Sequence, residues 1–243
     1  MKTIRMGFLL GASMLVVVSA AQAADPVNPE PAAIDWSGFY AGLHGGWGWA
    51  DAPASYNSAA NENCFENDSF FPGGCAVDLK PNGGLLGAQA GFNFVFDNGL
   101  VLGLEGDFGF ANIKDDGQSG NPDSGGFNFL TDVDQEVDKL ASVRGRLGVA
   151  VGNFLPFVTA GWGWAHGKRS AFGDFVDASE SNWHDGWVVG GGAEYAIDEN
   201  WSVKAEYRYY DLGKEEYMFN AITEGTDVDL DIQTIQVGVN FNF

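Results

Sequence analysis

Ile235-Gln-Val-Gly-Val-Asn-Phe-Asn-Phe243, the last stretch of the chain, alternates without a break between apolar residues and residues that are small or polar. A period of two is typical of a strand whose two faces meet different environments. A strand that ends on Phe-Asn-Phe is a poor edge for a soluble sheet. It suits the wall of a membrane barrel, where an aromatic girdle lies at each interface.

The same alternation recurs in seven earlier segments, and the connections between segments also alternate. Short turns such as Asp97-Asn98-Gly99 follow the second, fourth and sixth segments, whereas long polar loops follow the others. Short turns on the periplasmic side and long loops outside are typical of outer-membrane barrels. We therefore predict an all-β, eight-stranded antiparallel up-and-down transmembrane β-barrel, closed by pairing of the last segment with the first. The segments are 36–50, 84–96, 100–114, 133–151, 157–168, 183–197, 201–212 and 227–243.

The polar face of these segments carries as many positive as negative side chains. An unpaired buried charge is costly, but paired charges are tolerated inside a narrow barrel. On the lipid face each Arg or Lys near the midplane would cost about 2–4 kcal/mol. We therefore predict a charge network in the lumen, which in an eight-stranded barrel is just wide enough for side chains, and a largely plugged interior. Its members are Glu105, Asp107, Arg144, Arg146, Glu194, Lys204, Glu206 and Arg208.

The amino-terminal segment has the pattern of a secretory signal. Lys2 and Arg5 precede an apolar run, and Ala21-Gln22-Ala23 is a small-residue cleavage site. We expect residues 1–23 to be a cleaved signal peptide, 24–35 a Pro-rich periplasmic linker, and 36–243 the barrel. Further along the chain there is no apolar run of the roughly 18 residues that a spanning helix needs.

Charge and cysteine content narrow the function further. The formal net charge of −21 argues against nucleic-acid binding, which needs a basic face. The two cysteines, Cys64 and Cys75, are expected to form a disulfide because the exported chain meets an oxidising compartment.

Three motifs of this chain resemble the porin-family surface-antigen barrels of Gram-negative bacteria, the outer-membrane immunogenic proteins. They are the opening Trp36-Ser-Gly-Phe-Tyr-Ala-Gly-Leu-His-Gly-Gly-Trp-Gly-Trp49, Val203-Lys-Ala-Glu-Tyr-Arg-Tyr-Tyr-Asp-Leu-Gly213 and the terminal Gln236-Val-Gly-Val-Asn-Phe-Asn-Phe243. The resemblance covers the whole mature chain. It implies an eight-stranded barrel in the cell outer membrane with antigenic surface loops. It also implies that Val239, Phe241 and Phe243 belong to a terminal signal read by the barrel-assembly machinery.

Catalytic chemistry has little support in the sequence. No Ser-His-Asp arrangement is readable, so we expect no enzyme, and we expect no cofactor and no metal site. Glu194 and Glu206 could pass for a paired-carboxylate site, but neighbouring Lys204 and Arg208 favour an ion-pair network.

The three histidines are expected to have structural or solvated roles. His44 is expected to make a hydrogen bond in the lumen. His166 and His184 fall near the outer rim; they could meet and bind a metal or haem, although solvated side chains are the simpler interpretation.

The leading hypothesis is a structural outer-membrane barrel and surface antigen; the alternative is a small-solute porin or a haem or ligand receptor. Expected partners are outer-membrane lipid and lipopolysaccharide, the assembly machinery, and a host or environmental molecule at the loops. The acidic loops leave two interpretations open, a solvated surface or divalent-cation binding. Expected girdle anchors are Trp36, Tyr195, Trp201 and Phe243.

Overall fold

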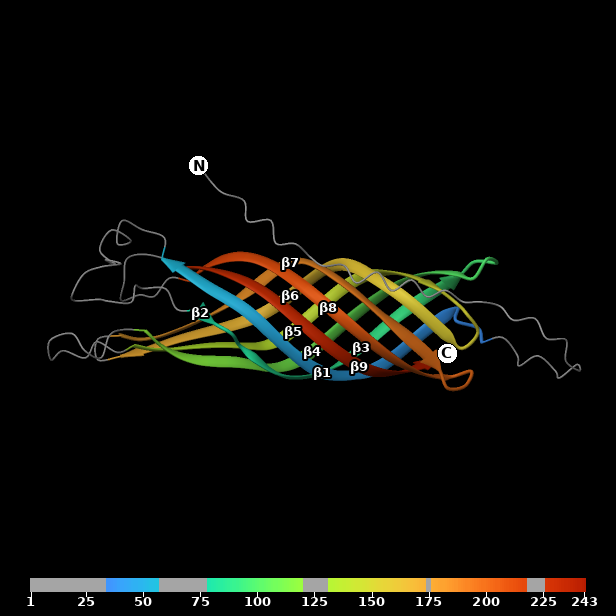
Figure 1. The fold of residues 1–243 in the computed structure, drawn as a ribbon, viewed down its shortest axis with the longest axis horizontal. Coiled ribbons are helices and arrows are strands. Elements are labelled where there is room, and N and C mark those ends of the chain that lie inside the picture. Colours follow the sequence, from blue (N-terminus) through green and yellow to red (C-terminus); the bar gives the residue numbers. More distant parts are fainter. Residues whose placement is uncertain (1–33, 57–77, 120–130, 174–175, 218–225) are drawn as a thin grey trace, which may run out of the picture. The chain divides into compact units, whose positions relative to one another are not determined.

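The computed structural model describes residues 34–56, 78–119, 131–173, 176–217 and 226–243. These residues form eight long antiparallel strands that close into a barrel, with a two-residue strand, β2, beside β1 (Figure 1). This confirms the predicted fold class. The strands are β1 (Gly38–Tyr56), β2 (Asp78–Leu79), β3 (Asn82–Val95), β4 (Leu100–Ser119), β5 (Thr131–Val149), β6 (Phe154–Gly173), β7 (Val176–Ala196), β8 (Trp201–Tyr217) and β9 (Thr226–Asn242).

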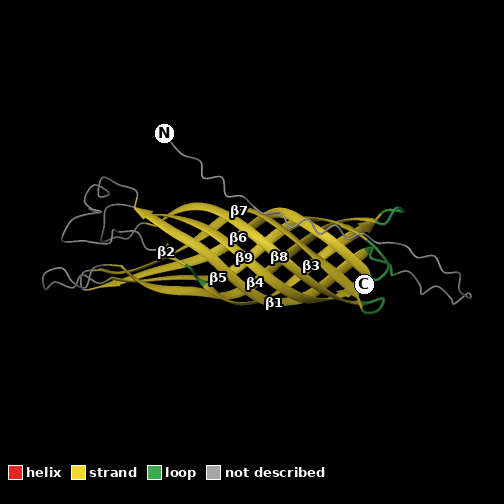
Figure 2. Ribbon diagram, viewed as in Figure 1, coloured by secondary structure: helices red, strands yellow, loops and turns green. Residues whose placement is uncertain are grey.

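The barrel closes where the two ends of the sequence meet. β1 pairs with β9 in antiparallel register from Tyr40 opposite Asn242 to Tyr56 opposite Thr226. The short turns and the carboxyl terminus lie at one end of the barrel (Figure 2). Closure removes the exposed sheet edge that the terminal strand would otherwise present. The described residues include no helix long and apolar enough to cross a bilayer.

The strands are longer than the alternating pattern predicts, so the predicted loops are too long. β4 continues to Ser119 and β5 begins at Thr131, inside the loop expected at 115–132. β6 and β7 likewise take up most of the loop expected at 169–182. The reason is that alternation reports lipid on one face and lumen on the other. Beyond the bilayer both faces can be polar, while the backbone ladder continues past local shifts of register.

The entry into β1 corrects one prediction about the girdle. The hydroxyl and the backbone amide of Ser37 both donate to Asp35, at 2.5 and 2.9 Å, and thereby lower the pKa of that exposed carboxyl. Trp36, expected at the lipid interface, instead lies inside the barrel end, where its indole donates to the carbonyl of Gly152. A Trp at the mouth of a barrel can bury its ring inward when its N–H finds a partner there.

The other three expected anchors face outward. Tyr195, Trp201 and Phe243 are 54%, 47% and 78% exposed on the outer wall. On every long strand, the apolar residues of the alternating pattern face outward on this wall. Large apolar side chains that are exposed all around a sheet are what a lipid-facing surface requires.

The interior changes chemistry along the strands. On β4, Val101 is followed by Glu105 and Asp107, and then by Ile113. Val101 belongs to a turn-end apolar cluster and Ile113 to a loop-end apolar cluster, so the charged side chains lie between two apolar layers. The turn-end cluster comprises Trp36, Val101, Leu155 and Ala196. The loop-end cluster comprises Ala50, Leu85, Ile113, Val137, Leu140, Ala165, Val188, Tyr210, Leu212, Leu230 and Ile232.

Some predictions fall outside the described residues. They concern the signal segment, most of the linker, and Cys64 and Cys75 with their expected disulfide.

Candidate functional site

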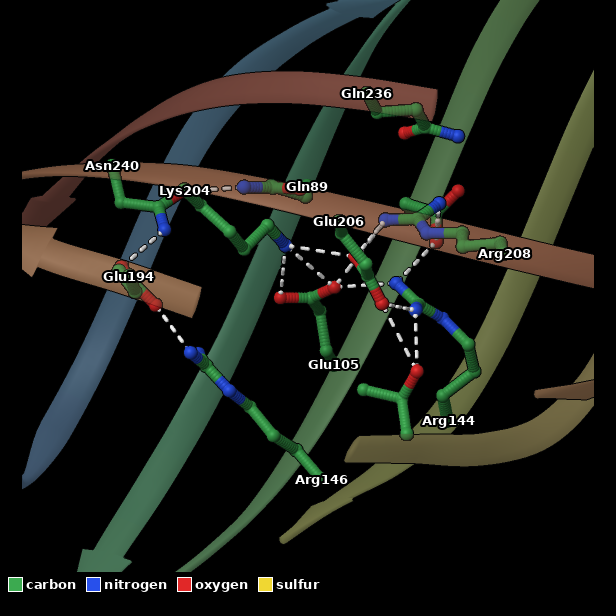
Figure 3. Close-up of polar contacts among 12 residues, drawn as sticks. Gln89, Glu105, Arg144, Arg146, Glu194, Lys204, Glu206, Arg208, Gln236 and Asn240 are labelled. Atoms are coloured by element: carbon green, nitrogen blue, oxygen red, sulfur yellow. Dashed lines mark hydrogen bonds and ion pairs between the residues drawn. The ribbon is translucent and has the colours of Figure 1, made fainter. Parts of the chain in front are cut away.

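The lumen network is centred on Arg144 of β5 (Figure 3). Its guanidinium donates to Glu105 at 2.5 Å and to Asp107 at 3.1 Å, both on β4. Its other terminal nitrogen donates to Glu206 of β8, and to the hydroxyl of Thr159 on β6 at 3.0 Å. One side chain therefore connects carboxylates from two strands that are not neighbours in the wall.

Two further cations from β8 complete this centre. Arg208 donates to Glu206 at 2.9 Å and lies 3.1 Å from an oxygen of Asp107. Lys204 donates to both oxygens of Glu105, at 2.9 and 2.7 Å, and its ammonium lies 3.5 Å from Glu206. Each carboxylate is thus shared by more than one cation, which makes a network rather than a set of separate pairs.

A second, smaller arm is built around Arg146 and Glu194, which form an ion pair. The carboxylate of Glu194 also accepts hydrogen bonds from Ser202 at 2.5 Å and from Asn240 at 2.7 Å. The Arg146 guanidinium lies 4.0 Å from the ring centroid of Phe157, a cation–π contact. This arm reaches toward the turn end, where the chain supplies neutral polar partners in place of further charges.

Tyr40 links the two arms, and sequence reasoning did not single it out. Its hydroxyl donates to Glu105 at 2.7 Å, and Arg146 approaches the same hydroxyl at 3.5 Å. Ser142, Thr159, Gln89 and Asn240 were also missed as participants. The two-residue alternation could have found them, because each lies on the same polar face of its strand as the charged residues.

All eight sequence-predicted charges lie in the lumen and are almost fully buried. Arg144 and Arg208 are 0% exposed. Full pairing is the condition under which such burial is tolerated, since removing one partner of a buried pair costs about 3–5 kcal/mol. Glu194 and Glu206 are each engaged by an arginine, so they do not form a paired-carboxylate site.

The histidines do not come together. His184 is paired in register with Ala165, and His166 with Trp183. His184 is fully buried inside, whereas His166 lies on the outer face, so the hypothesis that the two meet in a metal or haem site is wrong. His44 lies in the lumen, but its Nδ1 has no hydrogen-bond partner among the described residues. The described residues also contain no cluster of three or more His, Cys, Asp or Glu arranged to hold a metal ion.

The terminal strand, β9, closes the barrel against β1 and ends in aromatic side chains at the turn end. Val239 and Phe243 face outward, and Phe241 packs edge-on against Trp201 and Phe243 at 5.1 and 5.2 Å between ring centroids. The amide of Phe243 donates to the carbonyl of Phe39 at 2.9 Å, which ties the last residue to β1.

A closed antiparallel barrel with an apolar outer wall and a charged, paired interior defines an outer-membrane β-barrel protein. Comparison with known proteins agrees. Residues 10–243 match the family described as the outer membrane protein beta-barrel domain, and the chain belongs to that family.

The relatives are outer-membrane proteins too, so the chain is placed in the cell outer membrane. It is 32% identical to a 31 kDa outer-membrane immunogenic protein of Brucella melitensis, covering 97% of this chain and 98% of that one. It is 29% identical to a 25 kDa outer-membrane immunogenic protein of Brucella abortus over the full length of both. The outer-membrane protease OmpT of Escherichia coli shares the fold alone, with 10% identity, a TM-score of 0.50, and 84% and 96% of the two chains covered.

Proposed function

We propose that this protein is a structural outer-membrane barrel and surface antigen whose lumen is closed, and that it is not an enzyme. The charged layer of the lumen is the observation that carries the proposal. Four cations and four carboxylates from β4, β5, β7 and β8 neutralise one another across the lumen. Conduction would require ions to displace these mutual contacts in a space of low dielectric, where each broken pair is costly.

The two apolar clusters support the same proposal. They lie on either side of the charged layer, and several of their side chains, including Val101, Leu155 and Ile232, have no solvent exposure. An ion that crossed the lumen would have to pass both layers without hydration, which apolar side chains cannot replace. A small-solute porin, the alternative function, would need a continuous polar path instead.

The antigen part of the proposal rests on strand length and on the relatives. β5, β6 and β7 run about 20 residues each, whereas a tilted strand needs about 9–11 to cross a bilayer. With the short turns placed in the periplasm, the excess would project from the cell surface. The Brucella relatives carry the name immunogenic protein.

The terminal strand supports a role in assembly. We assign Val239, Phe241 and Phe243 to recognition by the barrel-assembly machinery, because this strand must pair with β1 last to close the wall. In cells, Phe243→Ala should lower the amount of folded protein in the outer membrane, while the protein refolded in detergent keeps its heat-modifiable migration.

Planar-bilayer recording tests the closed lumen. The refolded mature protein should give no steady single-channel current under conditions in which a general porin, used as the positive control, conducts. Heat-modifiable gel migration and β-type circular dichroism establish that the inserted protein is folded. Steady currents from the folded monomer would contradict the closed lumen and favour the small-solute porin.

A further inference from the structure

Lysines outside the lumen are distributed unevenly along the barrel. The exposed or half-exposed lysines of the described residues, Lys80, Lys114, Lys139 and Lys168, all lie toward the ends of the strands that are far from the short turns. The turns at 96–99, 150–153 and 197–200 contain no lysine or arginine. The formal net charge of the chain is −21, so its few outer lysines are not a general coating. With the short turns in the periplasm, these lysines lie at the end of the barrel that meets the outer leaflet.

A β-bulge on β5 builds a compact polar group on the outer wall. The register against β6 shifts between Val137 and Lys139, so Asp138 is the extra residue there and lies next to Lys139 on the outside. One carboxylate oxygen of Asp138 contacts Nδ1 of His166 at 2.6 Å, and the other accepts from the Lys139 ammonium at 2.6 Å. Both oxygens are therefore engaged, and the carboxylate orients an imidazole and an ammonium side by side.

Aromatic side chains place this group at the level of the membrane interface. Phe110, Lys139, His166 and Trp183 are consecutive partners across β4, β5, β6 and β7. Phe110 is 64% exposed at the edge of the apolar wall, and the Trp183 ring contacts the His166 ring in a tilted arrangement, 5.0 Å between centroids. Exposed tryptophan beside a cation is the composition expected at headgroup depth.

A second row of charged side chains, two lysines on either side of a glutamate, lies further from the turns on the same three strands. Lys114, Glu136 and Lys168 are opposite one another on β4, β5 and β6. By contrast, Asp51, Asp231 and Asp211 are opposite one another on β1, β9 and β8 and form an acidic row. Lys114, Lys139 and Lys168 therefore gather on the wall of β4–β6, beside the carboxylates of Glu136 and Asp138.

We propose that the Lys139–His166 group, supported by Lys114 and Lys168, binds a phosphate group of the lipid A part of lipopolysaccharide in the outer leaflet. This rests on the strand orientation in the proposed function. Asp138 engages Nδ1 of His166, which leaves Nε2 as the ring nitrogen toward the ligand; Nε2 donates to the phosphate in the protonated imidazolium, whose two ring nitrogens both carry a proton. Lys139 uses one of its three N–H donors on Asp138 and has two for the ligand. Trp183 holds the site at the interface while the acyl chains lie along the apolar wall below Phe110.

Binding of lipid A to the refolded protein in detergent, followed by native mass spectrometry, tests this site. Bisphosphorylated lipid A is compared with the same lipid after removal of both phosphates, and with phosphatidylglycerol. The variant combines Lys139→Gln with His166→Gln. The matched control is Lys80→Gln, which removes an exposed cation outside the site.

The bisphosphorylated lipid should bind about tenfold more tightly than either other lipid, because only it presents two phosphate groups to the lysines of the site. The double variant should lose about tenfold in affinity for it, and the Lys80→Gln control less than about twofold. Equal binding of the dephosphorylated lipid or of phosphatidylglycerol would overturn the proposal. So would wild-type affinity in a folded double variant, or full displacement of lipid A by millimolar inorganic phosphate. Bilayer recordings of the double variant should remain silent, so a failure here is distinguishable from failure of the closed lumen.

Discussion

The central charged layer and the loop-end apolar cluster fill the same lumen with opposite chemistry. In the charged layer, Arg144 and Arg208 are held by carboxylates that each serve several cations. In the loop-end cluster, Leu212, Leu230 and Ile232 pack with no polar contact to satisfy. The charged layer depends on every member being present, whereas the apolar cluster loses stability in proportion to the volume removed. The two layers thus lie one after the other along the lumen. Loss of a charge disturbs the charged layer, and loss of side-chain volume disturbs the apolar cluster.

The largest expected effect comes from removing the centre of the charged layer. Arg144→Ala leaves Glu105, Asp107 and Glu206 with fewer cations, and should lower the free energy of unfolding by about 3–5 kcal/mol. Urea unfolding of the protein in lipid vesicles, followed by tryptophan fluorescence, measures the change.

Arg146→Ala is the comparison variant, because Arg146 pairs with one carboxylate that Ser202 and Asn240 also satisfy. Its loss should be smaller. An equal or larger loss in Arg146→Ala would show that the sharing of carboxylates around Arg144 adds nothing.

An intermediate effect is expected in the apolar layer. Ile232→Ala removes a fully buried side chain of the loop-end cluster and should cost about 2–4 kcal/mol in the same unfolding measurement. Ile235→Ala, three residues away on β9, changes the same side chain on the lipid face, where it is 53% exposed. It should cost less than about 1 kcal/mol because no cavity forms against lipid. Similar losses for the two variants would refute the assignment of faces on β9.

The smallest effect separates a hydrogen bond to charge from a neutral one. Thr159→Val keeps the shape of a side chain that accepts from Arg144 and donates to Glu206, and should cost about 2 kcal/mol. Thr234→Val removes a hydroxyl that accepts from the neutral side-chain amide of Gln236, and should cost about 1 kcal/mol. If both variants lower the free energy of unfolding by the same amount, a hydrogen bond to a charged group of this layer is worth no more than a hydrogen bond between neutral groups.

Period-two alternation predicted much of the site but not its connections. It placed Glu105, Arg144 and Glu206 on one face of three different strands, as the structure has them. It could not show that Arg144 contacts Glu206, because those residues are 62 positions apart and meet across the lumen. The bulge at Asp138 was also beyond it. Val137 and Leu140 both lie inside, three residues apart, which a strict period of two does not allow.

The sequence by itself determined which face of each strand meets lipid, because transfer of apolar and charged side chains to hydrocarbon is decided residue by residue. It also determined that the terminal strand must find a partner, and β1 is that partner. Only the tertiary structure decided which rows of side chains share a level inside the barrel. That depends on strand tilt, register and bulges, which bring residues of distant strands together. The layered lumen and the outer group of Asp138, Lys139 and His166 both arise in this way.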